Sequence, residues 1–472
     1  MNSLLLVIES VVTAISNFFW GVPLFVGVLG TGLYYSFAFR FVPFTRIGYH
    51  FRHTYGVMFA RVTEGEGTFR SFAAACLAST MGVGSIAGVA TALTMGGPGA
   101  LFWMWMTAVV GSSTKMAEII LGQRYRVRFE TLNEYLCGRN YVFKNGLGWH
   151  SLAKTLAWTF VVSPWSLLVQ TNALTTTINQ VFGVTNQIIL WAVFLSLALV
   201  FVGGVRRIAA VAEILVPAVS VFYILTGLFI IVINYKEIIP ALAMITRYAF
   251  TPTAGLGGFA GITVAQAMRF GVARGVYSNE AGMGTGMGAH AAAIVDHPVR
   301  QASWGVIESL MNTMVICTIT GLSILITGVY LSHTNLTGAA LVAVAFESSY
   351  GQVGGAIVAI AITIFAWKTL LAAYYAGQKQ VNFVFGDTKA NTIAMYFWLF
   401  YYLFPIFLAG ADTGLLWIIS DTIMIISVCS SIAALIALRS VVISLHKDFW
   451  ERYLPALHSG KNPSTVHYAN KP

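Results

Sequence analysis

The sequence is poor in charged residues and in cysteine. Its 27 basic and 17 acidic residues make up 9% of a chain of 472 residues, whereas soluble domains carry about 25% charged residues. So few charges exclude a soluble enzyme of this size, because polar groups could not cover its surface. They also exclude a disordered chain, which needs high charge and low hydrophobicity. The four cysteines are scattered without a C-x-x-C pair, so we expect neither a disulfide framework nor a metal site.

Long apolar runs are abundant instead. Hydrophobic residues make up 57% of the chain, and it holds 45 glycines, a composition typical of polytopic helical membrane proteins. A membrane-spanning helix needs about 20 mostly apolar residues, and the sequence contains eleven such segments. They cover residues 15–39, 72–95, 98–122, 152–183, 186–205, 210–234, 258–295, 301–329, 350–377, 391–409 and 413–440.

The net charge of +10 predicts how the chain crosses the membrane. Of the 27 basic residues, 22 fall in alternate loops and the C-terminal end, and only Lys236 and Arg247 fall in the loops between them. By the positive-inside rule the 22 are cytoplasmic. We therefore expect a plasma (inner) membrane protein with its N-terminus outside and its C-terminus in the cytoplasm, which agrees with an odd helix count. The expected partner of the basic residues is the anionic inner leaflet of the bilayer, and no nucleic acid is expected.

Two of the predicted helices are interrupted. The second reads TMGVGSIAG over residues 80–88, and the seventh reads SNEAGMGTGMG over residues 278–288. Each glycine weakens a helix by up to about 1 kcal/mol, and unwound backbone at membrane depth is tolerated only where it is buried in protein or lines a cavity. The breaks lie five helices apart. They predict two five-helix units that each begin with a broken helix, the pattern of inverted-repeat secondary transporters.

Close packing of helices is the alternative reason for glycine in a membrane helix. We favour packing for Gly88 and for the glycines of the GGPG turn at residues 96–99. Packing does not explain why Asn279 and Glu280 stand beside glycines in the seventh helix, so a functional break is favoured there.

At these residues the sequence resembles the alanine/glycine:cation symporter family. The resemblance covers nearly the whole chain, and its most specific segment is residues 266–284. The matching segments are IAGVATAL from 86, GGPGALFWMWMT from 96, TKMAE from 114, QAMRFGVARGVYSNEAGMG from 266 and DHPVRQ from 296. The resemblance implies an all-α LeuT-type fold of ten core helices in a 5+5 inverted repeat, preceded by one extra helix. It also implies uptake of alanine or glycine driven by a sodium or proton gradient.

The expected organisation follows from the helix count and the resemblance. It comprises an extra N-terminal transmembrane helix (1–40), an interfacial amphipathic loop on the cytoplasmic side (41–71), a first repeat (72–234), a second repeat (258–440) and a cytoplasmic tail (441–472).

The resemblance also implies where a substrate binds. A small zwitterionic amino acid needs backbone N–H groups for its carboxylate, oxygen atoms for its ammonium and a small apolar niche. The broken helices and the fourth helix supply such groups. The expected substrate-binding residues are Thr80, Gly82, Gly84, Ser85, Gln170, Asn172, Asn279, Glu280, Gly282 and Gly284.

Several positions depart from the family pattern. Ser85 stands for an Asn, Asn312 for an Asp, Ala373 for a Trp and Lys368 for a Ser. In LeuT-type folds the helix that carries Lys368 supplies hydroxyls to a sodium site, so a lysine there repels or replaces Na⁺, or carries a proton. The alternative is that Lys368 extends to a membrane interface. The candidate coupling residues are Lys368, Thr369, Asn312 and Thr313.

Further ionisable residues invite interpretation as gates or as structural ion pairs. We expect Arg269 and Arg274 to pair with Glu280 or Glu308, with gating as the alternative, and Asp421 is a candidate gate residue near the outer end of its helix. Three further residues, Glu118, Lys115 and Arg124, resemble an ion-pair cluster at the inner face. His290, Asp296 and His297 are expected to pack at the inner face rather than to bind a metal.

The prediction is a secondary transporter of small neutral amino acids that works by cation symport and alternating access, with no cofactor other than Na⁺ or H⁺ as the coupling ion. The alternative is sodium-independent or proton-coupled uptake or exchange, with Lys368 occupying the sodium site. A channel is a remote alternative, because one pair of non-identical breaks does not form a ring of filter residues. No enzyme is expected, because the sequence has no intramembrane His cluster and no G-x-S-x-G motif.

Overall fold

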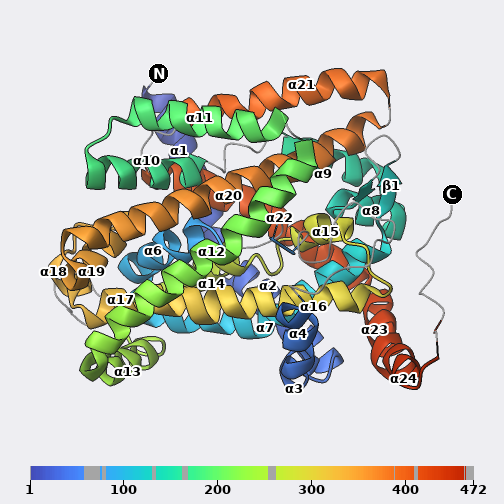
Figure 1. Cartoon of the computed structure of the whole chain (residues 1–472), viewed down its shortest axis with the longest axis horizontal. Coiled ribbons are helices and arrows are strands. Elements are labelled where there is room, and N and C mark those ends of the chain that lie inside the picture. The colour runs from blue at the N-terminus through green and yellow to red at the C-terminus, as the bar shows by residue number, and fades with distance from the viewer. Residues whose placement is uncertain are drawn as a thin grey trace.

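The computed structural model is almost entirely helical (Figure 1). It describes residues 2–57, 75–76, 81–129, 134–161, 168–202, 204–252, 262–386, 388–408, 413–461 and 463. The elements of its first half are α1 (Asn2–Phe19), α2 (Val22–Ala38), α3 (Val42–Thr45), α4 (Ile47–His53), η1 (Tyr55–Val57), η2 (Val83–Ser85), α6 (Ala87–Gly96), α7 (Gly99–Arg124), β1 (Val127–Phe129), β2 (Glu134–Leu136), α8 (Arg139–Leu147), α9 (His150–Val161), α10 (Leu168–Phe182), α11 (Asn186–Val202), α12 (Gly204–Ile233), η4 (Tyr235–Glu237) and α13 (Ile238–Tyr248).

The second half is built of helices joined by turns and short irregular segments. Its elements are α14 (Val264–Asn279), α15 (Gly286–Ala289), η5 (His290–Ala292), α16 (Pro298–Leu310), the π-helical η6 (Met311–Cys317), α17 (Thr318–Ile326), α18 (Val329–Ser332), α19 (Gly338–Tyr350), α20 (Gln352–Phe385), α21 (Lys389–Leu403), η7 (Phe404–Leu408), α22 (Thr413–Ala437), α23 (Arg439–Asp448), η8 (Phe449–Tyr453) and α24 (Leu454–His458).

The all-α expectation needs one correction. Strands β1 and β2 form an antiparallel hairpin with Val127 opposite Leu136. Basic residues and turns surround this stretch, so no helical or strand periodicity marks it in the sequence. The predicted amphipathic loop 41–71 contains α3, α4 and η1 up to residue 57, and its remainder lies outside the described residues.

Six helical segments among the described residues are long and apolar enough to cross a membrane. They are Ser10–Ala38, Ala210–Ile233, Pro298–Ile326, Gln352–Phe385, Lys389–Phe407 and Ser420–Ala437. A multi-pass membrane protein is therefore confirmed, whereas the count of eleven stays a prediction. The other five predicted spans correspond to helices that are shorter, more polar or interrupted in the described part of the chain.

Two groups of helices face each other across the centre of the molecule. Helix α7 packs against α14, α16 and α6, while α20 packs against α10, α12 and α21. Figure 1 shows α7 and α16 along one side and α11 and α21 along the other. Helix α7 approaches α14 closely because Gly271 has no side chain. A Cβ atom there would lie 2.4 Å from the carbonyl oxygen of Ala100, and small residues at such crossings are typical of membrane helices.

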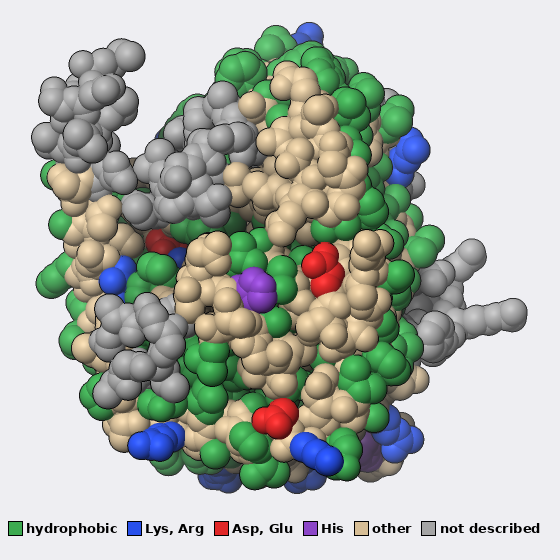
Figure 2. All heavy atoms as spheres, turned by 90° about the vertical axis from the view of Figure 1, so that its left-hand side faces the viewer, with side chains coloured by type: hydrophobic (Ala, Val, Ile, Leu, Met, Phe, Trp, Pro, Cys, Tyr) green, Lys and Arg blue, Asp and Glu red, His purple; other side chains and the backbone are tan. Residues whose placement is uncertain are grey.

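The two ends of the molecule differ in the elements they carry. In Figure 1, α13, α18 and α19 lie at one end, and α8, β1, α23 and α24 lie toward the other. Figure 2 looks at the end with α13, α18 and α19, and this face carries few charged side chains among hydrophobic and neutral ones. The predicted orientation of the termini stays a prediction.

Helices α4, α16 and α23 carry or adjoin three buried histidines, which we call the three-histidine cluster. They are His50 of α4, His297 just before α16 and His446 of α23. The imidazole of His446 stacks on Phe39 with the ring centroids 4.1 Å apart. Burial lowers the pKa of His50 and of His297 to about 4. Burial also lowers the pKa of His446 to about 3, with repulsion from the other two histidines adding to the effect. The cluster is therefore neutral at neutral pH.

Candidate functional site

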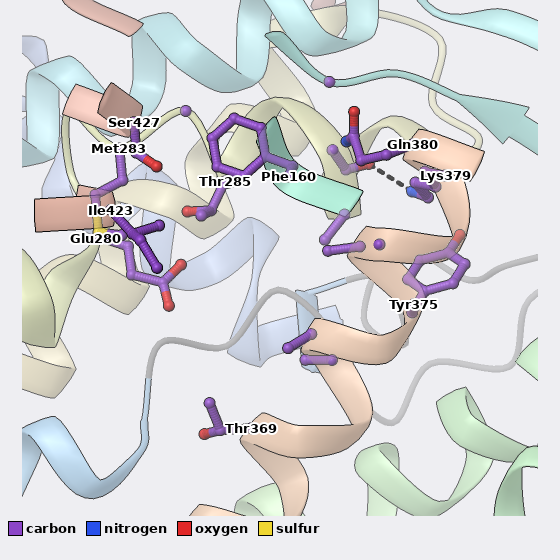
Figure 3. Close-up of a pocket in the computed structure, with 18 of the residues that line it drawn as sticks. Phe160, Glu280, Met283, Thr285, Thr369, Tyr375, Lys379, Gln380, Ile423 and Ser427 are labelled. Carbon is purple, nitrogen blue, oxygen red and sulfur yellow. Dashed lines mark hydrogen bonds between the residues drawn. The ribbon is translucent and has the colours of Figure 1, made fainter. Parts of the chain in front are cut away.

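A cavity of about 260 Å³ lies where the two interrupted helices meet α20. Gly82 and Gly84 line it from the first interruption, Glu280 and Gly284 from the second, and Lys368 from α20. Figure 3 shows Glu280, Met283 and Thr285 on one side of this space and Thr369, Tyr375 and Lys379 of α20 on the other. Of the predicted substrate residues, Gly82, Gly84, Gln170, Glu280 and Gly284 line the cavity.

The first interruption lies just before α6. Gly82 is extended, with φ −147° and ψ −168°, and the single turn η2 follows it before the helix resumes at Ala87. Side chains replace the missing helical hydrogen bonds. The Val83 N–H donates to Gln170 Oε1 at 3.3 Å, and Thr320 Oγ1 donates to the Ser85 carbonyl at 3.0 Å. Of the predicted residues, Thr80 lies outside the described residues.

The second interruption separates α14 from α15. Glu280 adopts a left-handed conformation (φ 55°), and Gly282 and Gly284 follow with φ of 89° and 74°. A non-glycine residue with positive φ is uncommon, and such strained backbone gathers at functional sites. Asn279 does not line the cavity. Its Oδ1 accepts the Ala281 N–H at 3.0 Å, and its Nδ2 donates to Thr107 Oγ1 at 3.1 Å.

Glu118 and Lys115, predicted to form an inner-face ion-pair cluster with Arg124, face the second interruption. Glu118 is fully buried, and its Oε1 accepts the Gly284 N–H at 2.7 Å and the Ser431 hydroxyl at 2.9 Å. Lys115 Nζ lies 3.9 Å from Glu280 Oε2. The face of α7 that carries both residues therefore turns toward the broken helix. Spacing along the sequence could not reveal this, because the partners lie in the second interruption and in α22.

Gln170 and Tyr277 join the two interrupted helices. Gln170 Nε2 donates to Tyr277 Oη at 3.0 Å, while its Oε1 accepts the Val83 N–H. Asn172, on the same helix as Gln170, is buried but does not line the cavity. Tyr277 was missed in the sequence, although it stands in the specific segment 266–284 just before the break.

Lys368 does not extend to a membrane interface. It is 2% exposed, and its Nζ donates to the carbonyl of Met81 at 3.3 Å. Since Met81 directly precedes Gly82, the ammonium lies against the first interruption. The interfacial alternative is therefore wrong. Thr369 also lines the cavity, and its hydroxyl donates to the Phe365 carbonyl.

Asn312 and Thr313 lie outside the cavity, in the π-helical turn η6. Asn312 Oδ1 accepts the Ser85 hydroxyl at 2.6 Å, and Asn312 Nδ2 donates to the Ser278 carbonyl at 2.5 Å. Asn312 thus connects both interrupted helices. Single π turns inside α-helices occur frequently at functional sites. Thr313 Oγ1 is buried without a hydrogen-bond partner among the described residues.

The predicted pairing of Arg269 and Arg274 with Glu280 or Glu308 is wrong. Arg274 forms a bidentate pair with Asp421, with Nη1 2.7 Å from Oδ1 and Nη2 3.0 Å from Oδ2. Its guanidinium carbon lies 4.0 Å from the centroid of the Trp417 ring. Arg269 instead donates to Asn17 Oδ1 at 2.5 Å. Two arginines five residues apart point to different faces of α14, and only Arg274 faces α22.

The predicted packing role of the two inner histidines fits the structure. His290 and His297 are fully buried, and His290 Nε2 lies 3.3 Å from Glu308 Oε2. Within the described part of the chain, no group of three or more His, Cys, Asp or Glu side chains could hold a metal ion.

Interrupted helices around a central cavity that charged side chains reach, in a protein with several membrane-spanning helices, indicate a membrane transporter. The sequence profile of the Sodium:alanine symporter family matches residues 5–465, so the chain belongs to that family. It is a transporter and not an enzyme.

Relatives agree with this assignment, and a solved structure shows a similar fold. The sodium/alanine symporter AgcS of Methanococcus maripaludis is 36% identical, over 94% of this chain and 97% of the relative. The probable sodium/glutamine symporter GlnT of Bacillus subtilis is 30% identical, over 97% of this chain and 93% of the relative. A manganese transporter of Eremococcus coleocola shares the fold, with a TM-score of 0.53, 12% identity and coverage of 86% of this chain and 92% of that chain.

Proposed function

We propose that this protein takes up alanine, glycine and similarly small neutral amino acids by alternating access, in a LeuT-type 5+5 arrangement with one extra N-terminal helix. The observation that carries the proposal is that both interrupted helices line one cavity. Freed N–H and C=O groups at such breaks bind the charged ends of a substrate. The names of the relatives, one of which is a sodium/alanine symporter, support this substrate class.

The cavity supplies the groups that a zwitterion needs. Glu280, whose side chain is 25% exposed, offers a carboxylate for the ammonium. The glycines of both interruptions let the backbone approach the substrate, and Ala372 and Ala373 of α20 form a small apolar wall. On the predicted outer side, the buried pair between Arg274 and Asp421 acts as the closed gate.

Two modes of coupling remain distinct candidates. One is symport with Na⁺ or H⁺, as in the family as a whole. The other, favoured by the contact of Lys368 Nζ with the Met81 carbonyl, is uptake or exchange without Na⁺. In that case the Lys368 ammonium occupies the position of a coupling cation. It excludes Na⁺ from that position, because a buried ammonium and a nearby cation repel each other.

Uptake into proteoliposomes tests the proposal. Labelled alanine and glycine are supplied with an inward Na⁺ gradient, a proton gradient or neither. Wild type and the Lys368→Ser variant are measured side by side, with Lys154→Ser as a control lysine away from the cavity. Uptake by the wild type supports the substrate class, and the absence of uptake under every gradient refutes it. Sodium dependence that arises only in Lys368→Ser supports the proposal that the Lys368 ammonium replaces a coupling cation. Sodium-driven uptake by the wild type refutes that proposal.

A further inference from the structure

A buried arginine from a connecting loop reaches the cavity. Arg139 is the first residue of α8, in the loop between α7 and α9 that the charge pattern predicts to be cytoplasmic. It is 8% exposed and lines the cavity together with Lys368 and Lys379. Eleven residues of α20 separate those two lysines, which is about 16 Å along a helix axis. The cavity is therefore longer than a small amino acid.

The guanidinium of Arg139 is held in place but keeps donors available. Its Nη1 donates to the Met283 carbonyl in the second interruption. Its Cζ lies 3.9 Å from the centroid of the Phe160 ring. The guanidinium has five N–H donors. Among the described residues, only the donor to the Met283 carbonyl has an acceptor. None of its nitrogens is fully enclosed without a partner, so the remaining donors open onto the cavity.

The positive charge of Arg139 has no ion-pair partner at contact distance. Glu118 and Glu280 act on it electrostatically, but no carboxylate oxygen in the described part of the chain lies within ion-pair distance. Glu118 Oε1 is already occupied by the Gly284 N–H and the Ser431 hydroxyl. A buried charge is costly unless it is paired. Arginine binds carboxylates through two parallel hydrogen bonds.

We propose that Arg139 is a second carboxylate-binding residue of the transport path, which receives the carboxylate of the amino acid as it leaves the central site toward the cytoplasm. The proposal rests on the proposed function. Lys379, whose Nζ donates to the Gly288 carbonyl at 2.7 Å, adds a second positive charge to the lining of the same cavity. The substrate thus passes from the interruptions to a cationic exit.

Arg126 provides a matched control for a purely structural role. It too is buried, donates to carbonyls of the second broken helix at Ala291 and Ala293, and has its guanidinium 4.2 Å from a tyrosine ring centroid. It does not line the cavity. Arg139→Gln and Arg126→Gln therefore remove the same kind of contact from the same broken helix, and only Arg139→Gln removes a cation from the cavity. Arg139→Lys keeps the charge but loses the planar, paired donors of the guanidinium.

The first measurement compares alanine exchange in proteoliposomes with alanine affinity of the purified protein. We expect Arg139→Gln to slow exchange about tenfold while the dissociation constant of alanine changes less than about threefold. The reason is that the Arg139 guanidinium binds the substrate carboxylate only after the substrate has left the central site. Arg139→Lys should be intermediate, and Arg126→Gln should keep the wild-type ratio of the two quantities. Wild-type exchange by Arg139→Lys, or an equal effect of Arg126→Gln, refutes the proposal.

The second measurement does not depend on transport. Succinate, a dicarboxylate without an amino group, is added to the purified full chain, and the thermal unfolding midpoint is recorded. We expect succinate to raise the midpoint of the wild type and of Arg126→Gln, but not of Arg139→Gln. No shift in the wild type, or an equal shift in Arg139→Gln, refutes the carboxylate site. If the wild type transports neither alanine nor glycine, the proposed function fails, and the succinate result still decides about Arg139.

Discussion

Replacing Asp421 with Asn should open the predicted outer side of the cavity. The side chains of Arg274 and Asp421 are 4% and 12% exposed and form two hydrogen bonds. Removing one partner of a buried ion pair costs about 3–5 kcal/mol, because the other charge stays buried and unpaired. We take about 3 kcal/mol, since Asp421 is partly exposed. If only the closed state contains the pair, the opening equilibrium rises roughly 150-fold.

Thiol labelling measures that opening. Ser427 and Cys137 both line the cavity, so Ser427→Cys in a background with Cys137→Ser and Cys429→Ser reports access by a membrane-impermeant thiol reagent added outside. The labelling rate should rise by about two orders of magnitude in Asp421→Asn. The control is Arg269→Gln, because Arg269 lies on the same helix but contacts Asn17 instead of α22. An unchanged rate in Asp421→Asn, or an equal rise in Arg269→Gln, would show that this pair does not hold the cavity closed.

Three further predictions address the second interruption, the cavity wall and the histidines. Gly284→Ala should lower both transport and the unfolding midpoint, because a Cβ atom there would lie 2.6 Å from Arg139 Cδ at a φ of 74°, a strain of about 1–3 kcal/mol. Gly282→Ala, whose added methyl meets open space, should cost less, and an equal loss in both variants would contradict the steric argument. Ala373→Trp should block amino acids larger than alanine while alanine and glycine still pass. Competition of unlabelled amino acids with labelled alanine measures this, and unchanged inhibition by larger amino acids would show that Ala373 does not limit the size of the substrate. The three-histidine cluster has pKa values below the ordinary 6.5, so the folded state binds fewer protons than the unfolded state. The free energy of unfolding is therefore highest above about pH 6.5 and falls as the pH drops toward 4, by up to about 3 kcal/mol per histidine. Unfolding midpoints between pH 7.5 and 4.5 should fall less steeply for His446→Phe than for the wild type, and parallel curves would rule the cluster out.

Local sequence features predicted the interruptions well. Glycine runs with a carboxylate and an amide mark the break after Asn279, because glycine supplies positive φ at no steric cost. The structure has Gly282 and Gly284 in that conformation. Gln170 likewise lies at the cavity. Helix boundaries were less well predicted. The span 350–377 is α20, which extends to Phe385 and follows a separate helix, α19, after the left-handed Gly351.

Partners across the fold could not be predicted in the same way. Arg274 was expected to pair with a carboxylate near in sequence, and its partner Asp421 lies 147 residues away. Arg139 carried no signal at all, since one arginine among many in a basic loop is indistinguishable from a topology residue. Such contacts depend on which helix faces another, and neither hydropathy nor spacing encodes that information.

By itself, the sequence determined that this chain is a multi-pass helical membrane transporter with two interrupted helices. The preference of long apolar runs for the membrane and the backbone freedom of glycine are local properties. Both can therefore be predicted from the residue types along the sequence. Only the tertiary structure decided that Lys368 lies on Met81, that Glu118 holds the second interruption and that Arg139 reaches the cavity. Each of these charges is buried, and its energy depends on the atoms that replace water around it. Those atoms come from helices that are distant in sequence.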